Sequence, residues 1–215
     1  MKNYLFILFF FLSHFAFAQS WEELIQQGIN LYQAGKYDEV ITIFEKARLQ
    51  AAKEFGKEHP SYATSCNNLA LLYHNQGRYS EAEVLYKEAK AIYEKVLGKE
   101  RPSYATSCNN LAGLYDSQGR YSEAEALYKE AKAIREKVLG KEHPDYAQSC
   151  NNLAVLYKDQ GRYSEAEDLF KEAKAIYEKV LGKENPSYAT SCNNLAALYD
   201  SQGRYSEAEA LYKEA

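Results

Sequence analysis

The chain has 215 residues, of which 46% are hydrophobic and 26% are charged, and its formal net charge is −4. These values are ordinary for a folded soluble protein, and the acidic balance does not favour a nucleic-acid-binding surface, which needs a basic face. The four prolines and the four cysteines both recur every 42 residues, at Pro60, Pro102, Pro144 and Pro186 and at Cys66, Cys108, Cys150 and Cys192. Internal repetition must therefore be resolved before domains are counted.

The N-terminal segment 1–18 has the pattern of an export signal. Lys2 precedes the apolar run 4–12, and residues 16–18 (Ala-Phe-Ala) match the small-x-small pattern of a cleavage site. The apolar run is shorter than the ~20 residues that a membrane-spanning helix needs. We therefore expect cleavage after Ala18 and a mature chain that is periplasmic or secreted, with no membrane contact after cleavage.

The remaining chain divides at the 42-residue period into five units. The second and third units differ at only six positions, and the partial fifth unit differs from the start of the third at one. The units are 19–60, 61–102, 103–144, 145–186 and 187–215.

The second unit illustrates the helix pair predicted for each repeat. In its first half, apolar residues recur at helical spacing, which predicts a helix that buries one stripe. The stripe is formed by Tyr62, Cys66, Leu69, Ala70 and Tyr73. Neither helix of a pair can bury its stripe alone, so the units are expected to stack into a solenoid.

The ends of the second predicted helix are marked by polar residues and glycine. Ser80 and Glu83 have the spacing of a capping box, which predicts a helix that begins at Ser80. Gly98 follows the last apolar residue, as is typical of a helix C-terminus, and Pro102 is placed to open the next helix. The tyrosines on these stripes, Tyr73, Tyr79, Tyr86 and their copies, are expected in the core.

The motif Asn68-Leu69-Ala70-x-x-Tyr73-x-x-x-Gly77-x-Tyr79-x-x-Ala82-x-x-x-Tyr86-x-x-Ala89 resembles the tetratricopeptide repeat, in the 42-residue form of kinesin light chains. The match recurs five times over residues 19–215. The resemblance implies an all-α, right-handed superhelical solenoid of antiparallel helix pairs, with the first helices lining a concave groove. It also implies a non-catalytic scaffold that binds a protein or a peptide there.

No constellation of residues indicates catalysis or a cofactor. The cysteines hold one inward position in successive units, and stacked helices lie about 8–10 Å apart, which exceeds the ~7 Å limit for the Cα atoms of a disulfide. We therefore expect four buried free thiols. His59, His74 and His143 lack companions at metal-ligand spacing, and no cofactor is expected.

The groove face is predicted from the stripe opposite the packing stripe. Four of its columns vary between otherwise similar units, which indicates either adjustment to a ligand or free drift of exposed positions. Two asparagine columns do not vary. The resemblance implies that the column of Asn68 holds a bound peptide, with Asn67 and its copies at the groove edge; the alternative is that the asparagines only bond neighbouring turns and loops. The candidate groove residues are Asn68, Asn110, Asn152, Asn194, Asn67, Asn109, Asn151, Leu71, His74, Asp116, Lys158 and Asp159.

The chain stops at Ala215, inside a predicted helix and without a polar capping helix, which open solenoids normally carry. Two functional hypotheses follow. The repeats are either a scaffold that binds a partner in the groove, or the regulatory docking arm of a longer protein with a downstream catalytic or signalling domain. Self-association through the uncapped C-terminal end is a further expectation. The charges of the groove are mixed, so the sign of the ligand stays open.

Overall fold

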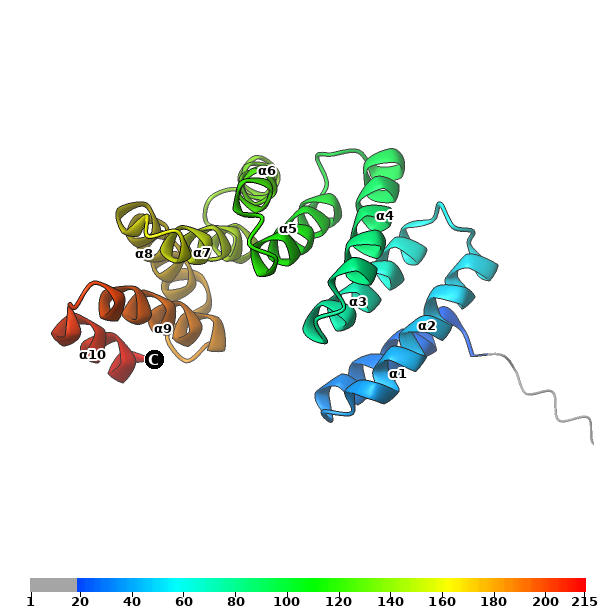
Figure 1. The fold of residues 1–215 in the computed structure, drawn as a ribbon, viewed down its shortest axis with the longest axis horizontal. Helices are drawn as coiled ribbons and strands as arrows, with labels where there is room; N and C mark the ends of the chain where they lie inside the picture. The colour runs from blue at the N-terminus through cyan, green and yellow to red at the C-terminus, as the bar shows by residue number, and fades with distance from the viewer. Residues whose placement is uncertain (1–18) are drawn as a thin grey trace, which may run out of the picture.

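The computed structural model describes residues 19–215 and shows ten α-helices in five antiparallel pairs (Figure 1). The predicted export signal, residues 1–18, lies outside the described residues. The first helices of the pairs are α1 (Trp21–Gln33), α3 (Pro60–Asn75), α5 (Pro102–Ser117), α7 (Pro144–Asp159) and α9 (Pro186–Ser201). The second helices are α2 (Tyr37–Glu54), α4 (Tyr79–Leu97), α6 (Tyr121–Leu139), α8 (Tyr163–Leu181) and α10 (Tyr205–Glu214). No helix of this part of the chain is both long and apolar enough to span a bilayer.

Proline and glycine delimit the helices as the sequence predicts. Each of α3, α5, α7 and α9 has proline in its first turn, where the missing N–H has no intrahelical acceptor to lose. The second helix of the second unit ends at Gly98, whose φ of 83° is a left-handed conformation that glycine adopts without a Cβ penalty.

The start of the second helix differs from the prediction. Helix α4 begins at Tyr79, and Arg78 takes the N-cap position without a side-chain cap. Arg78 pairs with Glu81 and stacks 3.9 Å over the ring of Tyr73, so this arginine organises the turn. The capping box predicted for Ser80 and Glu83 is therefore wrong.

The predicted packing stripe forms the core. Tyr62, Cys66, Leu69, Ala70 and Tyr73 are all buried, as are their counterparts in later units. All four cysteines are free and buried, as predicted. Burial is the main cause that raises the pKa of Cys66, Cys108 and Cys150 to about 12, which leaves these thiols unreactive at neutral pH.

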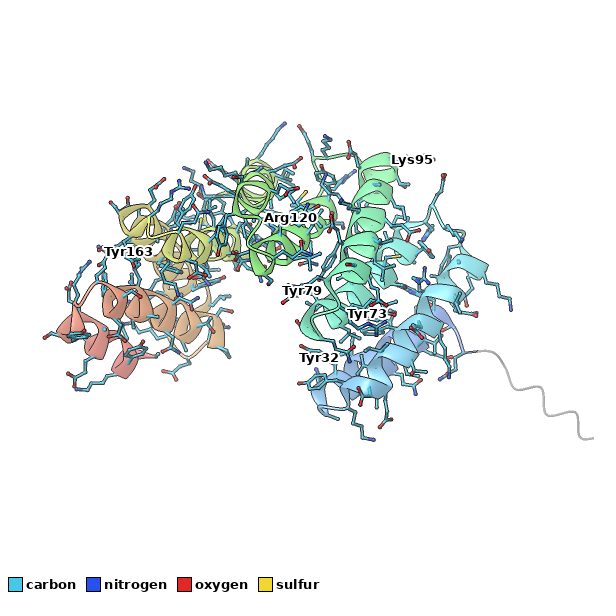
Figure 2. The ribbon with its side chains drawn as sticks, in the orientation of Figure 1. Tyr32, Tyr73, Tyr79, Lys95, Arg120 and Tyr163 are labelled. Atoms are coloured by element: carbon cyan, nitrogen blue, oxygen red, sulfur yellow. The ribbon has the colours of Figure 1, made fainter. Side chains whose placement is uncertain are left out.

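Some of the tyrosines do not follow the prediction of burial. Tyr73 and Tyr86 are buried, but Tyr212, the counterpart of Tyr86 in the fifth unit, is 46% exposed. The counterparts of Tyr79 are partly exposed, up to 70% for Tyr205. These residues open each second helix at the turn edge, where no later element covers them. Figure 2 shows Tyr79 and Tyr163 at this edge, together with Arg120.

Polar contacts at the turn edge tie each later pair to the one before it. Tyr115 donates to Glu83 at 3.2 Å, and Arg120 donates to the same carboxylate at 2.9 Å while stacking 3.8 Å over the Tyr115 ring. The same arrangement recurs with Glu125 and with Glu167. The first junction lacks it because Ile41 occupies the position of the glutamate.

The two layers of helices are spaced differently, and this difference curves the array. The first helices α3, α5, α7 and α9 contact one another in series, whereas open clefts separate second helices. One such cleft, of about 390 Å³, lies between α4 and α6, with Leu111 of α5 at its base. The closely spaced first helices therefore form the inner, concave layer of the arc that Figure 1 shows.

Candidate peptide-binding groove

The predicted groove residues lie on the inner layer, on α3, α5, α7 and α9, where successive first helices meet. Leu71 of α3 is 41% exposed on this layer, and its counterparts are Gly113, Val155 and Ala197. The column thus changes the width of the groove from unit to unit. At the contacts between neighbouring first helices the structure brings Asn109 together with Asn152, and His74 together with Ser117.

The asparagine columns bond across these contacts. The Asn152 side-chain amide of α7 donates to Oδ1 of Asn109 on α5 at 2.9 Å. Asn67 and Asn151, by contrast, are 7% and 9% exposed, and their Oδ1 atoms have no hydrogen-bond partner within the described chain. A buried amide oxygen without a partner is costly.

The remaining asparagines, Asn68, Asn110 and Asn194, are half-buried, with no side-chain hydrogen bond to another described residue. An asparagine side chain offers both a donor and an acceptor, which matches the backbone of an extended peptide. The contact between Asn152 and Asn109 shows that one step of the column also serves to hold α5 against α7. This contact joins one asparagine of each column and corresponds to the alternative role, a bond between neighbouring helices.

The C-terminal ends of the first helices carry the charged candidates. His74 Nε2 of α3 lies 2.8 Å from Oγ of Ser117 on α5, and burial lowers the pKa of His74. One unit later the same two positions are Asp116 and Asp159. Lys158 pairs with Asp159 at 3.4 Å.

Arg135, which the sequence analysis did not identify, is the most unusual residue at the groove. It lies near the end of α6, is 3% exposed, and replaces the tyrosine found at Tyr93 and Tyr177 in the neighbouring units. Within residues 19–215 it makes no ion pair with a carboxylate, and its Nε has no hydrogen-bond partner. The available signal was the arginine in a column where the second and fourth units carry tyrosine.

Neutral oxygens surround the Arg135 guanidinium. Nη1 donates to the backbone oxygen of Asp145 and to Oγ of Ser149, both at 2.9 Å, and to the side chain of Gln148 at 3.4 Å. Nη2 donates to Oγ1 of Thr106 at 3.2 Å. Burial is the main cause that lowers the pKa of Arg135, but an arginine stays charged at any working pH. The charge of Asp145 offsets part of this burial cost, so the protein holds an incompletely compensated positive charge, without an ion pair in the described chain, under the groove.

Thr106 and Gln148 are exposed groove residues, so the guanidinium lies directly beneath the surface between α5 and α7. In the second unit the corresponding tyrosine, Tyr93, shares a hydrogen bond of 2.8 Å with Thr64. The tyrosine hydroxyl forms a hydrogen bond with the threonine and places no charge beneath the groove. The third unit thus carries a positive charge, on Arg135, where the second and fourth units carry a neutral tyrosine.

The α5/α7 contact therefore has three zones along its length. Arg135 lies at one end, the bonded pair Asn109 and Asn152 lies in the middle, and Asp116 and Asp159 lie at the other end. Residues 19–215 contain no cluster of three or more histidine, cysteine or carboxylate side chains that could hold a metal ion. The arrangement is suited to recognition by hydrogen bonds and charge.

Comparisons with known proteins agree with this architecture. The tetratricopeptide repeat family model matches residues 23–95, 64–137, 104–179 and 151–215. A structure of kinesin light chain nearly identical TPR-like repeats from Podosopora anserina is 33% identical, with a TM-score of 0.71 over 90% of this chain and 92% of that chain. BtubC (BKLC) from P. vanneervenii is 26% identical, with a TM-score of 0.75 over 89% of this chain and 76% of that chain.

A Rap protein complexed with competence and sporulation factor shares the fold at 18% identity, with a TM-score of 0.77 over 90% of this chain and 52% of that chain. A search of curated proteins finds no match. Tetratricopeptide repeats are in general non-catalytic scaffolds for protein–protein interaction. With four overlapping family matches that span 23–215 and ten helices in consecutive pairs, the chain belongs to the tetratricopeptide repeat family.

Proposed function

We propose that the chain is a scaffold that binds an extended peptide, or an extended segment of a partner domain, in its concave groove across the contact between α5 and α7. The observation that carries this proposal is Arg135. A buried cation without a counter-charge costs several kcal/mol relative to solution, by order of magnitude, and this cost is recovered when an anionic group reaches it. The exposed side chains of Thr106 and Gln148 accept hydrogen bonds from the guanidinium.

The neighbouring asparagines support a peptide as the ligand. Asn110 is half-buried one residue from Asn109, and the buried Oδ1 of Asn151 is unpaired. Peptide N–H and C=O groups complement such amides, and a carboxylate from an acidic side chain or a chain terminus complements Arg135. The proposed ligand is therefore a peptide with at least one carboxylate, held through its backbone by the asparagine columns.

The test begins with selection of ligands from a displayed library of random nine-residue peptides on the immobilised chain. Fluorescence polarisation then compares binding of the best peptide to the parent chain and to the Asn110→Ala/Asn152→Ala variant. The exposed serines Ser122 and Ser164 on α6 and α8 provide a matched neutral control, Ser122→Ala/Ser164→Ala.

We expect the asparagine variant to bind at least tenfold more weakly, because two hydrogen-bonding side chains at about 1 kcal/mol each are removed, while the serine control is unchanged. Circular dichroism establishes that both variants keep their helicity. Equal binding by both variants, at full helicity, would show that the peptide is bound elsewhere.

We also propose that the chain acts outside the cytoplasm, in the periplasm or after secretion. The support is the composition of residues 1–18, with a basic start, an apolar run and a small-x-small end. Mass spectrometry of the chain recovered from its native cell should give an N-terminus at Gln19. Recovery of a chain that starts at Met1 in the cytoplasmic fraction would contradict this.

A further inference from the structure

Two carboxylates face each other at the end of the groove opposite Arg135. Asp116 lies on α5 and Asp159 on α7, at the positions that His74 and Ser117 occupy one unit earlier with a separation of 2.8 Å. The Asp116 carboxylate has no hydrogen bond or ion pair with another side chain among residues 19–215, and Lys158 engages one oxygen of Asp159. Burial and, after it, the charge of Asp159 raise the pKa of Asp116, in agreement with the short separation of the equivalent His74 and Ser117 side chains.

A tyrosine hydroxyl lies beneath the same place. Tyr128 of α6 is 6% exposed, and its hydroxyl makes no hydrogen bond within the described chain. A Cβ atom built on Gly113 would lie 3.3 Å from this hydroxyl, so Tyr128 points at the groove surface where Gly113 has no side chain to cover it. In the second unit, Leu71 replaces the glycine, and the Tyr86 hydroxyl is buried without a hydrogen-bond partner in the described chain.

The fifth unit shows that this hydroxyl and this carboxylate are within reach of each other. There, Tyr212 donates to Asp200 at 3.0 Å, and these residues correspond to Tyr128 and Asp116. The third unit is thus the one in which a half-buried glycine, an unpaired tyrosine hydroxyl and two neighbouring carboxylates coincide.

We infer that Asp116, Asp159 and the Tyr128 hydroxyl form a subsite for one cationic group of the bound ligand, the ammonium of a lysine or the guanidinium of an arginine. An ammonium has three N–H donors and no acceptor, and the subsite offers oxygen acceptors from three side chains. The inference rests on the proposed function and specifies the chemistry of its ligand.

The separation of the two charged ends defines a spacing in the ligand. Thr106, above Arg135, and Asp116 are ten residues apart on α5, which is about 15 Å at 1.5 Å per residue. An extended peptide covers this distance in about four or five residues at ~3.3 Å each. The preferred ligand therefore carries a basic and an acidic side chain four or five positions apart.

The test selects peptides from the random nine-residue library in parallel on three chains. These are the parent, Asp116→Asn/Asp159→Asn, and a control of equal net charge, Asp168→Asn/Glu184→Gln, whose altered side chains are exposed outside the groove. We expect the parent and the control to enrich lysine or arginine four or five positions from an acidic residue. The groove variant should lose the basic preference and bind the parent's best peptide about tenfold more weakly.

A second variant tests shape without a change of charge. Gly113→Leu restores the leucine that covers the tyrosine in the second unit, and it should weaken the same peptide by a similar factor. Peptides selected without a basic preference, or a preference that survives in Asp116→Asn/Asp159→Asn, would overturn the subsite while leaving groove binding intact.

A small cation separates failure of the subsite from failure of the whole proposal. n-Butylamine, as its ammonium ion, is titrated into the isotope-labelled chain while the Gly113 amide is followed by NMR. A saturable shift in the parent that is absent from Asp116→Asn/Asp159→Asn supports the subsite even if no peptide is selected. No shift at Gly113 in the parent at millimolar amine would overturn it.

Discussion

Replacing Arg135 by tyrosine should stabilise the solenoid while weakening its ligand binding. The substitution restores the residue found at Tyr93 and Tyr177, and the new hydroxyl would meet Thr106 as Tyr93 meets Thr64, at 2.8 Å. The guanidinium now has four neutral acceptors, no carboxylate and an unpaired Nε. Buried charges of this kind are replaced by packed residues of similar volume with gains of about 1–4 kcal/mol.

The gain is measured by urea unfolding followed by far-UV circular dichroism. We expect the free energy of unfolding to rise by about 1–2 kcal/mol, the low end of that range, because the four existing hydrogen bonds offset part of the cost. The same variant should bind the selected acidic peptide at least tenfold more weakly, since it lacks the cation.

The reverse substitution, Tyr93→Arg, serves as the matched control. It places a guanidinium in the second unit and should destabilise the chain, because a buried charge replaces a satisfied hydroxyl. If Arg135→Tyr is less stable than the parent by more than 1 kcal/mol, the neutral oxygens fully compensate the guanidinium. The reasoning that assigns an incompletely compensated charge to the groove would then be refuted.

Three further predictions follow from the core and the turn edge. A thiol reagent should label the four cysteines only in denaturant, since all are buried with raised pKa values; a mass two or four hydrogens below that of the reduced chain would contradict this. Glu125→Ile, which copies Ile41, should cost about 1 kcal/mol in urea unfolding by removing hydrogen bonds from Tyr157 and Arg162; an unchanged midpoint would show that these contacts add nothing. The hydrogen bond from Lys129, together with those from Arg162 and Tyr157, lowers the pKa of Glu125 to about 2. The contribution of Glu125 to the free energy of unfolding is therefore complete above its ordinary pKa of 4.5 and is lost as the pH falls toward 2. The difference in stability between Glu125→Gln and the parent should shrink over that pH range, and a constant difference would refute the assignment.

The helix pairs and the packing columns could be predicted because the same helical spacing of apolar residues recurs in successive repeats. Tyr62, Cys66 and Leu69 recur at helical spacing, and no arrangement other than stacking buries them together. The start of α4 could not be predicted from Ser80, because Arg78 takes over the turn through contacts with Glu81 and the Tyr73 ring. Such contacts are not visible as a local motif.

The groove was predicted as a face but not in its details. A helical projection places Asn67 and Asn68 together, yet Asn67 is buried in the stacked units whereas Asn68 is half-buried. Arg135 lies on a second helix, and its approach to the groove depends on how far α6 reaches over α7. Both facts depend on the stacking of units, which a single repeat does not specify.

Photo-cross-linking of the selected peptide tests the central claim most directly. A benzophenone group is placed at the middle of the peptide, and the cross-linked residues of the parent chain are identified by mass spectrometry. The account predicts attachment to α5 and α7, within 102–117 and 144–159, and its loss in the Arg135→Tyr chain. Attachment to α4, α6 or α8, at the outer clefts, in both chains would contradict it.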